Sequence, residues 1–184
     1  MILPIFTYGH PVLKKKAIES DQNKEELIEL VQNMWETMYA AQGVGLAAPQ
    51  IGLSIRLFVI DTIQIMDEEK KAEGIKKTFI NAKVVEETGD LWSYEEGCLS
   101  IPNIRGEVER TQKVRIQYMD SDFKNHDEIY EGINARVIQH EYDHIEGILF
   151  VEKLKPLKRR LIQRKLNEIK LGKIEADYKI KMLR

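Results

Sequence analysis

The chain has 184 residues, of which 43% are hydrophobic and 32% are charged, and its net charge is −2. This balance is typical of a globular domain with a real core, so we expect a single domain over residues 1–184. No apolar run approaches the roughly 20 residues of a membrane span, which excludes a membrane protein. The start lacks a basic leader, and the single cysteine, Cys98, excludes an internal disulfide, so we expect a cytoplasmic protein.

Helical spacing marks the first half of the chain. We predict a helix over residues 21–41, with Asp21 as N-cap, from the apolar residues Leu27, Leu30, Val31, Met34, Trp35 and Met38. Gly43 and Gly45 are expected to end it, and residues 43–50 form a loop of small residues. A buried strand is expected at residues 56–61, followed by an exposed loop over residues 62–77.

The second half alternates in the manner of strands before it turns helical. Strands are predicted at residues 78–86, 90–94, 107–110, 113–119 and 127–130. Helices are predicted at residues 132–147 and 156–171, the latter with Leu157, Leu161, Leu166 and Ile169 on one side. Because helices do not separate the strands, we expect an α+β fold, with antiparallel sheets packed around a central helix and a further helix towards each end.

The most informative stretch is His140-Glu141-Tyr142-Asp143-His144. On a helix, the two histidines lie four residues apart and so share one face, where they can bind one metal ion. Glu141 then stands beside a water on that metal and can act as a general base. The two residues could instead be ordinary surface histidines. However, the apolar residues before His140 indicate a buried helix, and buried imidazoles need polar partners.

A catalytic ion of this kind needs a third protein ligand and an open position for water. One large protease group has a further histidine six residues after the second, but Phe150 stands there. His10 and His126 lie in polar, turn-like contexts and are expected at the surface. Cys98, at the end of a predicted strand, is the best candidate, although a free cysteine is usually a small buried hydrophobe.

Three separated segments resemble the signature motifs of the peptide deformylases. They are Gly43-Val44-Gly45-Leu46-Ala47-Ala48-Pro49-Gln50, Glu96-Gly97-Cys98-Leu99-Ser100 and Gln139-His140-Glu141-Tyr142-Asp143-His144. Their order and spacing fit that family, and Gly9-His10-Pro11-Val12-Leu13 is similar to its N-terminal segment. The resemblance covers nearly the whole chain and implies the peptide deformylase fold. It also implies the family's activity, which removes the formyl group from the N-formylmethionine of newly made bacterial proteins.

The resemblance implies a role for each motif residue. Cys98, His140 and His144 would hold the metal, and Glu141 would move the proton from water to the leaving amine. The side-chain amide of Gln50 and the backbone N–H of Leu99 would stabilise the charge on the formyl oxygen. The substrate peptide would bind like an added strand. Its contacts would be Gly45 and Arg105, with a methionine pocket formed by Val44, Tyr94, Ile133 and Val137.

The identity of the ion is left open by the ligand types. A thiolate and two imidazoles accept zinc, iron, cobalt or nickel. The family resemblance implies Fe²⁺ in the cell, with Zn²⁺, Ni²⁺ or Co²⁺ able to occupy the purified protein.

Two alternative functions remain open. A metalloprotease would share the helix motif but would not explain Cys98 or Gln50, and a structural metal site would need a fourth protein ligand.

A basic segment lies near the end of the chain. Residues 153–173 carry nine Lys or Arg and one acidic residue, so the rest of the chain has a net charge of −10. This basic helix is either a solvated face or, as the family resemblance implies, a contact with ribosomal RNA. No DNA or membrane partner is expected.

Overall fold

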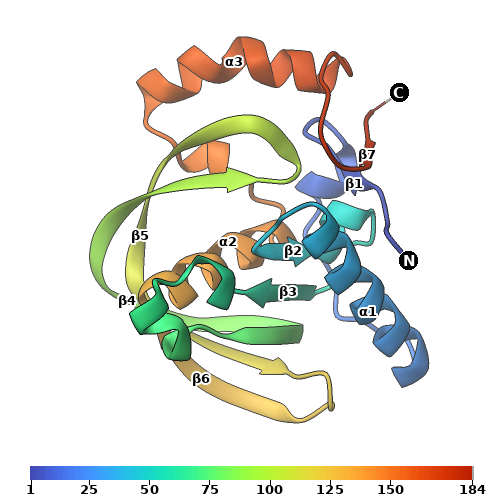
Figure 1. Ribbon diagram of the computed structural model, residues 1–184, viewed down its shortest axis with the longest axis vertical. Coiled ribbons are helices and arrows are strands. Elements are labelled where there is room, and N and C mark those ends of the chain that lie inside the picture. Colours follow the sequence, from blue (N-terminus) through green and yellow to red (C-terminus); the bar gives the residue numbers. More distant parts are fainter. Residues whose placement is uncertain (184) are drawn as a thin grey trace.

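A computed structural model describes residues 1–183 and has the expected α+β fold (Figure 1). The helices are α1 (Lys24–Ala40), α2 (Gly132–Ile145) and α3 (Pro156–Lys170). The strands are β1 (Ile5–Phe6), β2 (Gly45–Ala47), β3 (Leu57–Asp61), β4 (Lys76–Cys98), β5 (Ile101–Met119), β6 (Asn125–Glu131) and β7 (Ile180–Lys181). Among these described residues, no helix combines the length and apolar character that a membrane crossing demands.

Five strands form one antiparallel sheet in the order β2-β3-β4-β5-β6, and β1 pairs in parallel with β7 in a separate two-stranded sheet. The long β4–β5 hairpin curves around α2, which lies at the centre of the molecule (Figure 1). Register shifts near residues 80–91 mark bulges that bend β4, and Gly89 has a φ of +85°. The strands predicted at residues 78–86 and 90–94 are therefore one bent strand, as are those at 107–110 and 113–119.

Three buried clusters hold the elements together. In the first, Phe58 and Phe79 stack with ring centroids 4.7 Å apart, beneath Ala135 and Ile138 of α2. The second lies under α1, and the third joins α3 to β5. Because α2 contacts the sheet through the first cluster, the histidine motif that it carries is fixed relative to the strands.

The start of α1 differs from the prediction. Asn23, and not Asp21, is the N-cap, because its side chain accepts a hydrogen bond from the N–H of Glu26 at 3.0 Å. At the other end, Gln42 rather than a glycine adopts the left-handed conformation, with a φ of +56°. The Gly43 N–H then donates to the Met38 carbonyl at 2.8 Å, which completes the helix stop.

Other predicted segments are more ordered, or differently faced, than expected. The loop at residues 43–50 contains β2 and a 3₁₀ turn (Ala48–Ile51), and the loop at 62–77 contains 3₁₀ turns at Ile63–Ile65 and Glu68–Glu73. On α3 the buried residues are Ile162, Leu166 and Ile169, whereas Leu157 and Leu161 are exposed. The buried face is formed by residues spaced four and three apart, from Ile162 to Leu166 to Ile169. Leu157 and Leu161 lie outside this face.

Candidate metal centre and active site

Cys98 reaches the centre of the molecule at the last position of β4. The pairing with β5 shifts register between Gly97 and Cys98, and Cys98 pairs with Ile101 across a tight connection. This places the thiol next to the histidines of α2. The Cys98 Sγ lies 3.3 Å from the His144 Nε2.

The two histidines lie on one face of α2, as their spacing predicts. Their ring centroids are 5.2 Å apart, and one ligand atom from each, together with the Cys98 sulfur, lies within 4.8 Å of the others. The predicted third ligand is therefore brought to the pair. His10 and His126 are not part of this group. Their polar contexts had predicted surface positions, and both side chains are half-buried.

These residues fit one divalent ion. A thiolate and two imidazoles are donors that borderline metals accept, and three protein ligands leave a position for water. Within residues 1–183, the buried His144 Nδ1 and the Glu141 Oε2 have no hydrogen-bond partner. Burial also lowers the pKa of His144 well below its ordinary value, which keeps the imidazole neutral, as a ligand must be.

Glu96 is the hub of a buried charge network that supports this centre. Its carboxylate accepts hydrogen bonds from the Nδ1–H of His140 at 2.7 Å, from Nε and Nη2 of Arg110 at 2.8 and 2.9 Å, and from Nη1 of Arg136 at 2.9 Å. Arg110 also donates to Asp143 at 2.8 Å. The bond to Glu96 places the His140 proton on Nδ1 and leaves Nε2 free to bind the ion.

The network also sets the charge of Glu96. Burial alone would raise the pKa of this carboxyl, but hydrogen bonds from His140 and Arg110 outweigh burial and hold the pKa well below its ordinary value. Glu96 therefore stays ionised throughout the physiological range. Its negative charge offsets two arginines that are both almost fully buried.

Sequence reasoning assigned no role to these supporting residues. Arg110 occupies an inward position of β5, in alternation with the buried Ile104 and Val108. This alternation is a signal that the side chain is buried and paired. Arg136 and Asp143 similarly lie on the buried face of α2, four and one residues from the two histidines.

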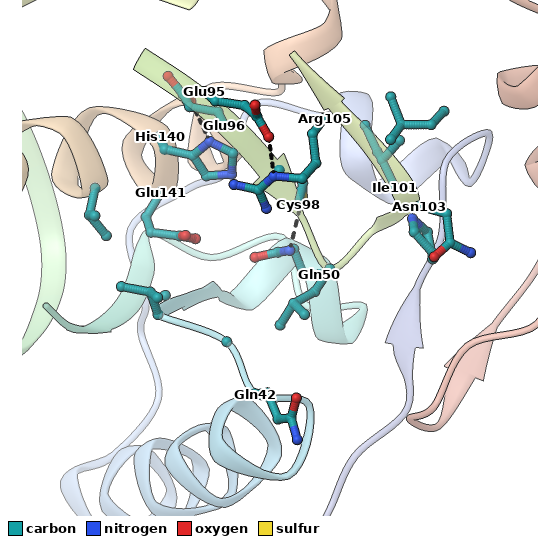
Figure 2. A pocket seen from close by; sticks show the side chains of 18 of the residues that line it. Gln42, Gln50, Glu95, Glu96, Cys98, Ile101, Asn103, Arg105, His140 and Glu141 are labelled. Carbon is teal, nitrogen blue, oxygen red and sulfur yellow. Dashed lines mark hydrogen bonds and ion pairs between the residues drawn. The ribbon is translucent and has the colours of Figure 1, made fainter. Parts of the chain in front are cut away.

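Glu141 lies in the cleft, close to the Gly-rich segment. Its side chain is buried, and burial raises the pKa of the carboxyl to about 7. A Cβ added to Gly45 would lie 2.7 Å from the Glu141 Cδ, so only glycine allows this approach. Figure 2 shows the Glu141 carboxylate and the Gln50 amide extending into the same space.

Gln50 is held rigidly on the opposite side of that space. Its Oε1 accepts a hydrogen bond from the Ala47 N–H at 2.8 Å, which fixes the orientation of the amide. Its Nε2 donates to Ser100 Oγ at 3.2 Å and faces the Cys98 sulfur at 3.5 Å. One N–H of this amide thus lies beside the Cys98 sulfur, close to the two histidines.

A cleft of about 640 Å³ opens onto these groups. Most of the predicted substrate-binding residues line it: Val44, Gly45, Tyr94, Arg105 and Val137. Arg105 is exposed and pairs with Glu95 at 2.6 Å. Ile133, one turn before Val137 on α2, is not among the lining residues of the described chain. Sequence reasoning missed the segment at residues 175–178, which forms a further part of the wall.

An antiparallel α+β fold around a His-Glu-x-x-His helix, with a cysteine near both histidines and a carboxylate in an open cleft, is characteristic of metal-dependent hydrolases. The family model for "Polypeptide deformylase" matches residues 2–160. A peptide deformylase of Christiangramia forsetii is 53% identical over 98% of this chain and 96% of its own length. One from Flavobacterium johnsoniae is also 53% identical, with the same coverage.

Solved structures agree with these relatives. The crystal structure of a peptide deformylase from Legionella pneumophila has a TM-score of 0.80 and 38% identity, over 94% of this chain and 98% of that one. The chain belongs to the polypeptide deformylase family. It is a metal-dependent hydrolase that removes the formyl group from N-formylmethionine at the start of newly made proteins.

The Glu96 network yields a first prediction. Glu96→Gln removes the charge that offsets Arg110 and Arg136 and weakens the bond that orients His140. We expect metal affinity to fall about 10- to 100-fold. We also expect the free energy of unfolding to fall by about 3–5 kcal/mol, the usual cost of breaking a buried ion pair. Competition with a chromophoric chelator and urea unfolding measure the two effects.

Glu95→Gln is the matched control, since Glu95 is the preceding residue and makes only an exposed ion pair with Arg105. It should leave both quantities nearly unchanged. Wild-type metal affinity in the Glu96→Gln protein would refute the orienting role of this carboxylate.

Proposed function

We propose that Cys98, His140 and His144 hold the ion on which deformylation depends. The observation that carries this assignment is the cluster of one sulfur and two imidazoles within 4.8 Å of one another. Beside it lies the Glu141 Oε2 atom, which has no hydrogen-bond partner among residues 1–183. A divalent ion bound there would supply a water of lowered pKa and would polarise the formyl carbonyl. The remaining steps are the work of the protein's own side chains.

Glu141 is the proposed general base. It accepts a proton from the attacking water and later passes it to the leaving amine. Its position supports this role, because the Oε2 atom is buried, has no partner among residues 1–183 and lies in the cleft. Burial raises the pKa of this carboxyl above its ordinary value, which favours proton uptake by Glu141.

Gln50 and Leu99 are the proposed oxyanion donors. When the formyl carbon is attacked, negative charge develops on the formyl oxygen, and fixed donors stabilise it best. The Gln50 amide is held by Ala47 and Ser100, and its second Nε2 hydrogen, which lies beside the Cys98 sulfur, would donate to the formyl oxygen. The backbone N–H of Leu99 follows Cys98 directly and would be the second donor.

The cleft is the proposed site for the formyl-methionine end of the substrate. Val44, Tyr94 and Val137 offer apolar surface for the methionine side chain, while Gly45 and Arg105 would contact the peptide backbone. Ile133 is the fourth proposed member of this pocket, one turn before Val137 on α2. We further propose one catalytic domain over residues 1–184, acting in the bacterial cytoplasm, where the Cys98 thiol stays reduced.

Replacing Glu141 tests the mechanism. In Glu141→Ala we expect the ion to remain bound, because the three ligands are intact, while turnover falls by about 10²–10⁴-fold. Formate release from a formyl-Met peptide measures turnover, and elemental analysis measures the ion. Glu29→Ala, on the exposed side of α1, is the control and should keep full activity.

Two results would contradict this function. Unchanged formate release by Glu141→Ala would exclude the general-base role and favour a structural metal site. Cleavage of internal peptide bonds without formate release would instead indicate a metalloprotease.

We propose Fe²⁺ as the ion in the cell, on the strength of the family resemblance. Protein prepared without oxygen should contain about one iron per chain, and its activity should decay in air because a ferrous ion beside a thiolate is readily oxidised. Protein reloaded with Ni²⁺ or Co²⁺ should keep its activity in air. An air-stable, fully active enzyme that contains zinc from the start would overturn the assignment.

We propose that the basic face of α3 contacts the ribosome. Ile162, Leu166 and Ile169 attach α3 to the body, which leaves Lys158, Arg159 and Arg160 exposed to solvent. Exposed cations attract the phosphates of RNA and release counterions, so binding should weaken as salt rises.

Co-sedimentation with ribosomes tests this contact. Changing Lys158, Arg159 and Arg160 to Gln should weaken co-sedimentation and flatten its salt dependence, by a slope of about 0.7–0.9 for each lost phosphate contact. The control changes three exposed lysines elsewhere, namely Lys70, Lys71 and Lys83. Equal binding by the two triple variants would count against the proposal.

A further inference from the structure

The segment that follows α3 returns to the body of the molecule. Gly172, with a φ of +71°, reverses the chain, and Ile174 packs against the third cluster. The segment then runs to β7, beside β1 (Figure 1). The N–H groups of Ile5 and Thr7 donate to the carbonyls of Lys179 and Lys181 at 2.9 and 3.1 Å. Residues 174–181, which we name the C-terminal strap, are therefore anchored at both ends.

The middle of the C-terminal strap is a wall of the catalytic cleft. Glu175, Ala176, Asp177 and Tyr178 line the same cleft as Cys98, His140 and Glu141. The family model ends at residue 160, so this wall lies outside the stretch that the model matches. The strap thus adds residues to the site that none of the three signature motifs contains.

Tyr178 is the residue of the strap that contacts the catalytic loop. Its hydroxyl donates a hydrogen bond to the Leu99 carbonyl at 2.7 Å. Its ring is half-buried and packs, with Leu99, against the second cluster. The contact joins two positions 79 residues apart and falls on the residue that follows the cysteine ligand.

The loop after Cys98 is held at three points. Besides Tyr178 on the Leu99 carbonyl, the Tyr8 N–H donates to the Ser100 carbonyl at 2.8 Å, and Gln50 binds the Ser100 hydroxyl. The N–H and the carbonyl of Leu99 flank one Cα, so a fixed carbonyl restrains the direction of the N–H. An oxyanion donor must be aimed in advance to be effective, and small misplacements are costly.

We propose that Tyr178 is a positioning residue for deformylation, which acts by aiming the Leu99 N–H at the formyl oxygen. The inference rests on the proposed role of Leu99 as an oxyanion donor. Such a contact stabilises the transition state more than the bound substrate, so its loss lowers kcat and leaves KM nearly unchanged. If the strap served only to pack the chain or only to bind the peptide, the loss of the Tyr178 hydroxyl would not lower kcat while leaving KM unchanged.

Tyr178→Phe tests the proposal, because it keeps the ring and removes only the hydroxyl. With metal-loaded enzyme and a formyl-Met tripeptide, we expect kcat to fall about 10-fold while KM stays within about two-fold. Metal content and the unfolding midpoint should match the wild type. Tyr8→Phe is the matched control, since Tyr8 holds the same loop through its backbone N–H, and its kcat should be unchanged.

Three outcomes would overturn the proposal: an unchanged kcat in Tyr178→Phe, a rise in KM alone, or an equal loss of kcat in Tyr8→Phe. A failure of the proposed mechanism looks different, because Glu141→Ala would then release formate at the wild-type rate.

Discussion

The buried carboxylate of Glu96 is the interaction on which the rest of the site depends. Two arginines are almost fully buried around it, and without a negative partner each would carry a desolvation cost of several kcal/mol. The same carboxylate fixes the tautomer of His140, so one group both stabilises the fold and orients a proposed metal ligand. Glu96 also ties β4, β5 and α2 together, the three elements whose relative placement defines the centre.

The side chains proposed for catalysis are held by close neighbours. Gln50 is fixed by the backbone of Ala47 and the hydroxyl of Ser100, and Glu141 packs over Gly45. Electrostatic stabilisation of a developing charge is most effective when the donors do not reorganise as the reaction proceeds. The cleft therefore has rigidly held hydrogen-bond donors at its floor and is open to solvent at its entrance, where Arg105 and Glu95 are exposed.

Local patterns predicted the motif residues, whereas long-range pairing could not be predicted. The spacing of His140 and His144 specifies one helix face whatever the surroundings, and Cys98 could be proposed as a ligand because a catalytic ion needs a third one. The Glu96 pairs span 14 to 44 residues, and no short pattern encodes them. The curvature of β4 and the buried face of α3 likewise depend on neighbours that meet only after folding, whereas the Asn23 cap is a local contact with the N–H of Glu26. A helical face likewise does not reveal which of its residues border a cavity: Val137 lines the cleft, whereas Ile133 is not among the lining residues described.

The pairing of β1 with β7 couples the start of the fold to the wall of the cleft. The first strand of the molecule is complete only when residues 180–181 lie beside it, and Tyr178 reaches Leu99 from the same segment. A change that frees this segment should therefore leave β1 unpaired and open one wall of the cleft at the same time.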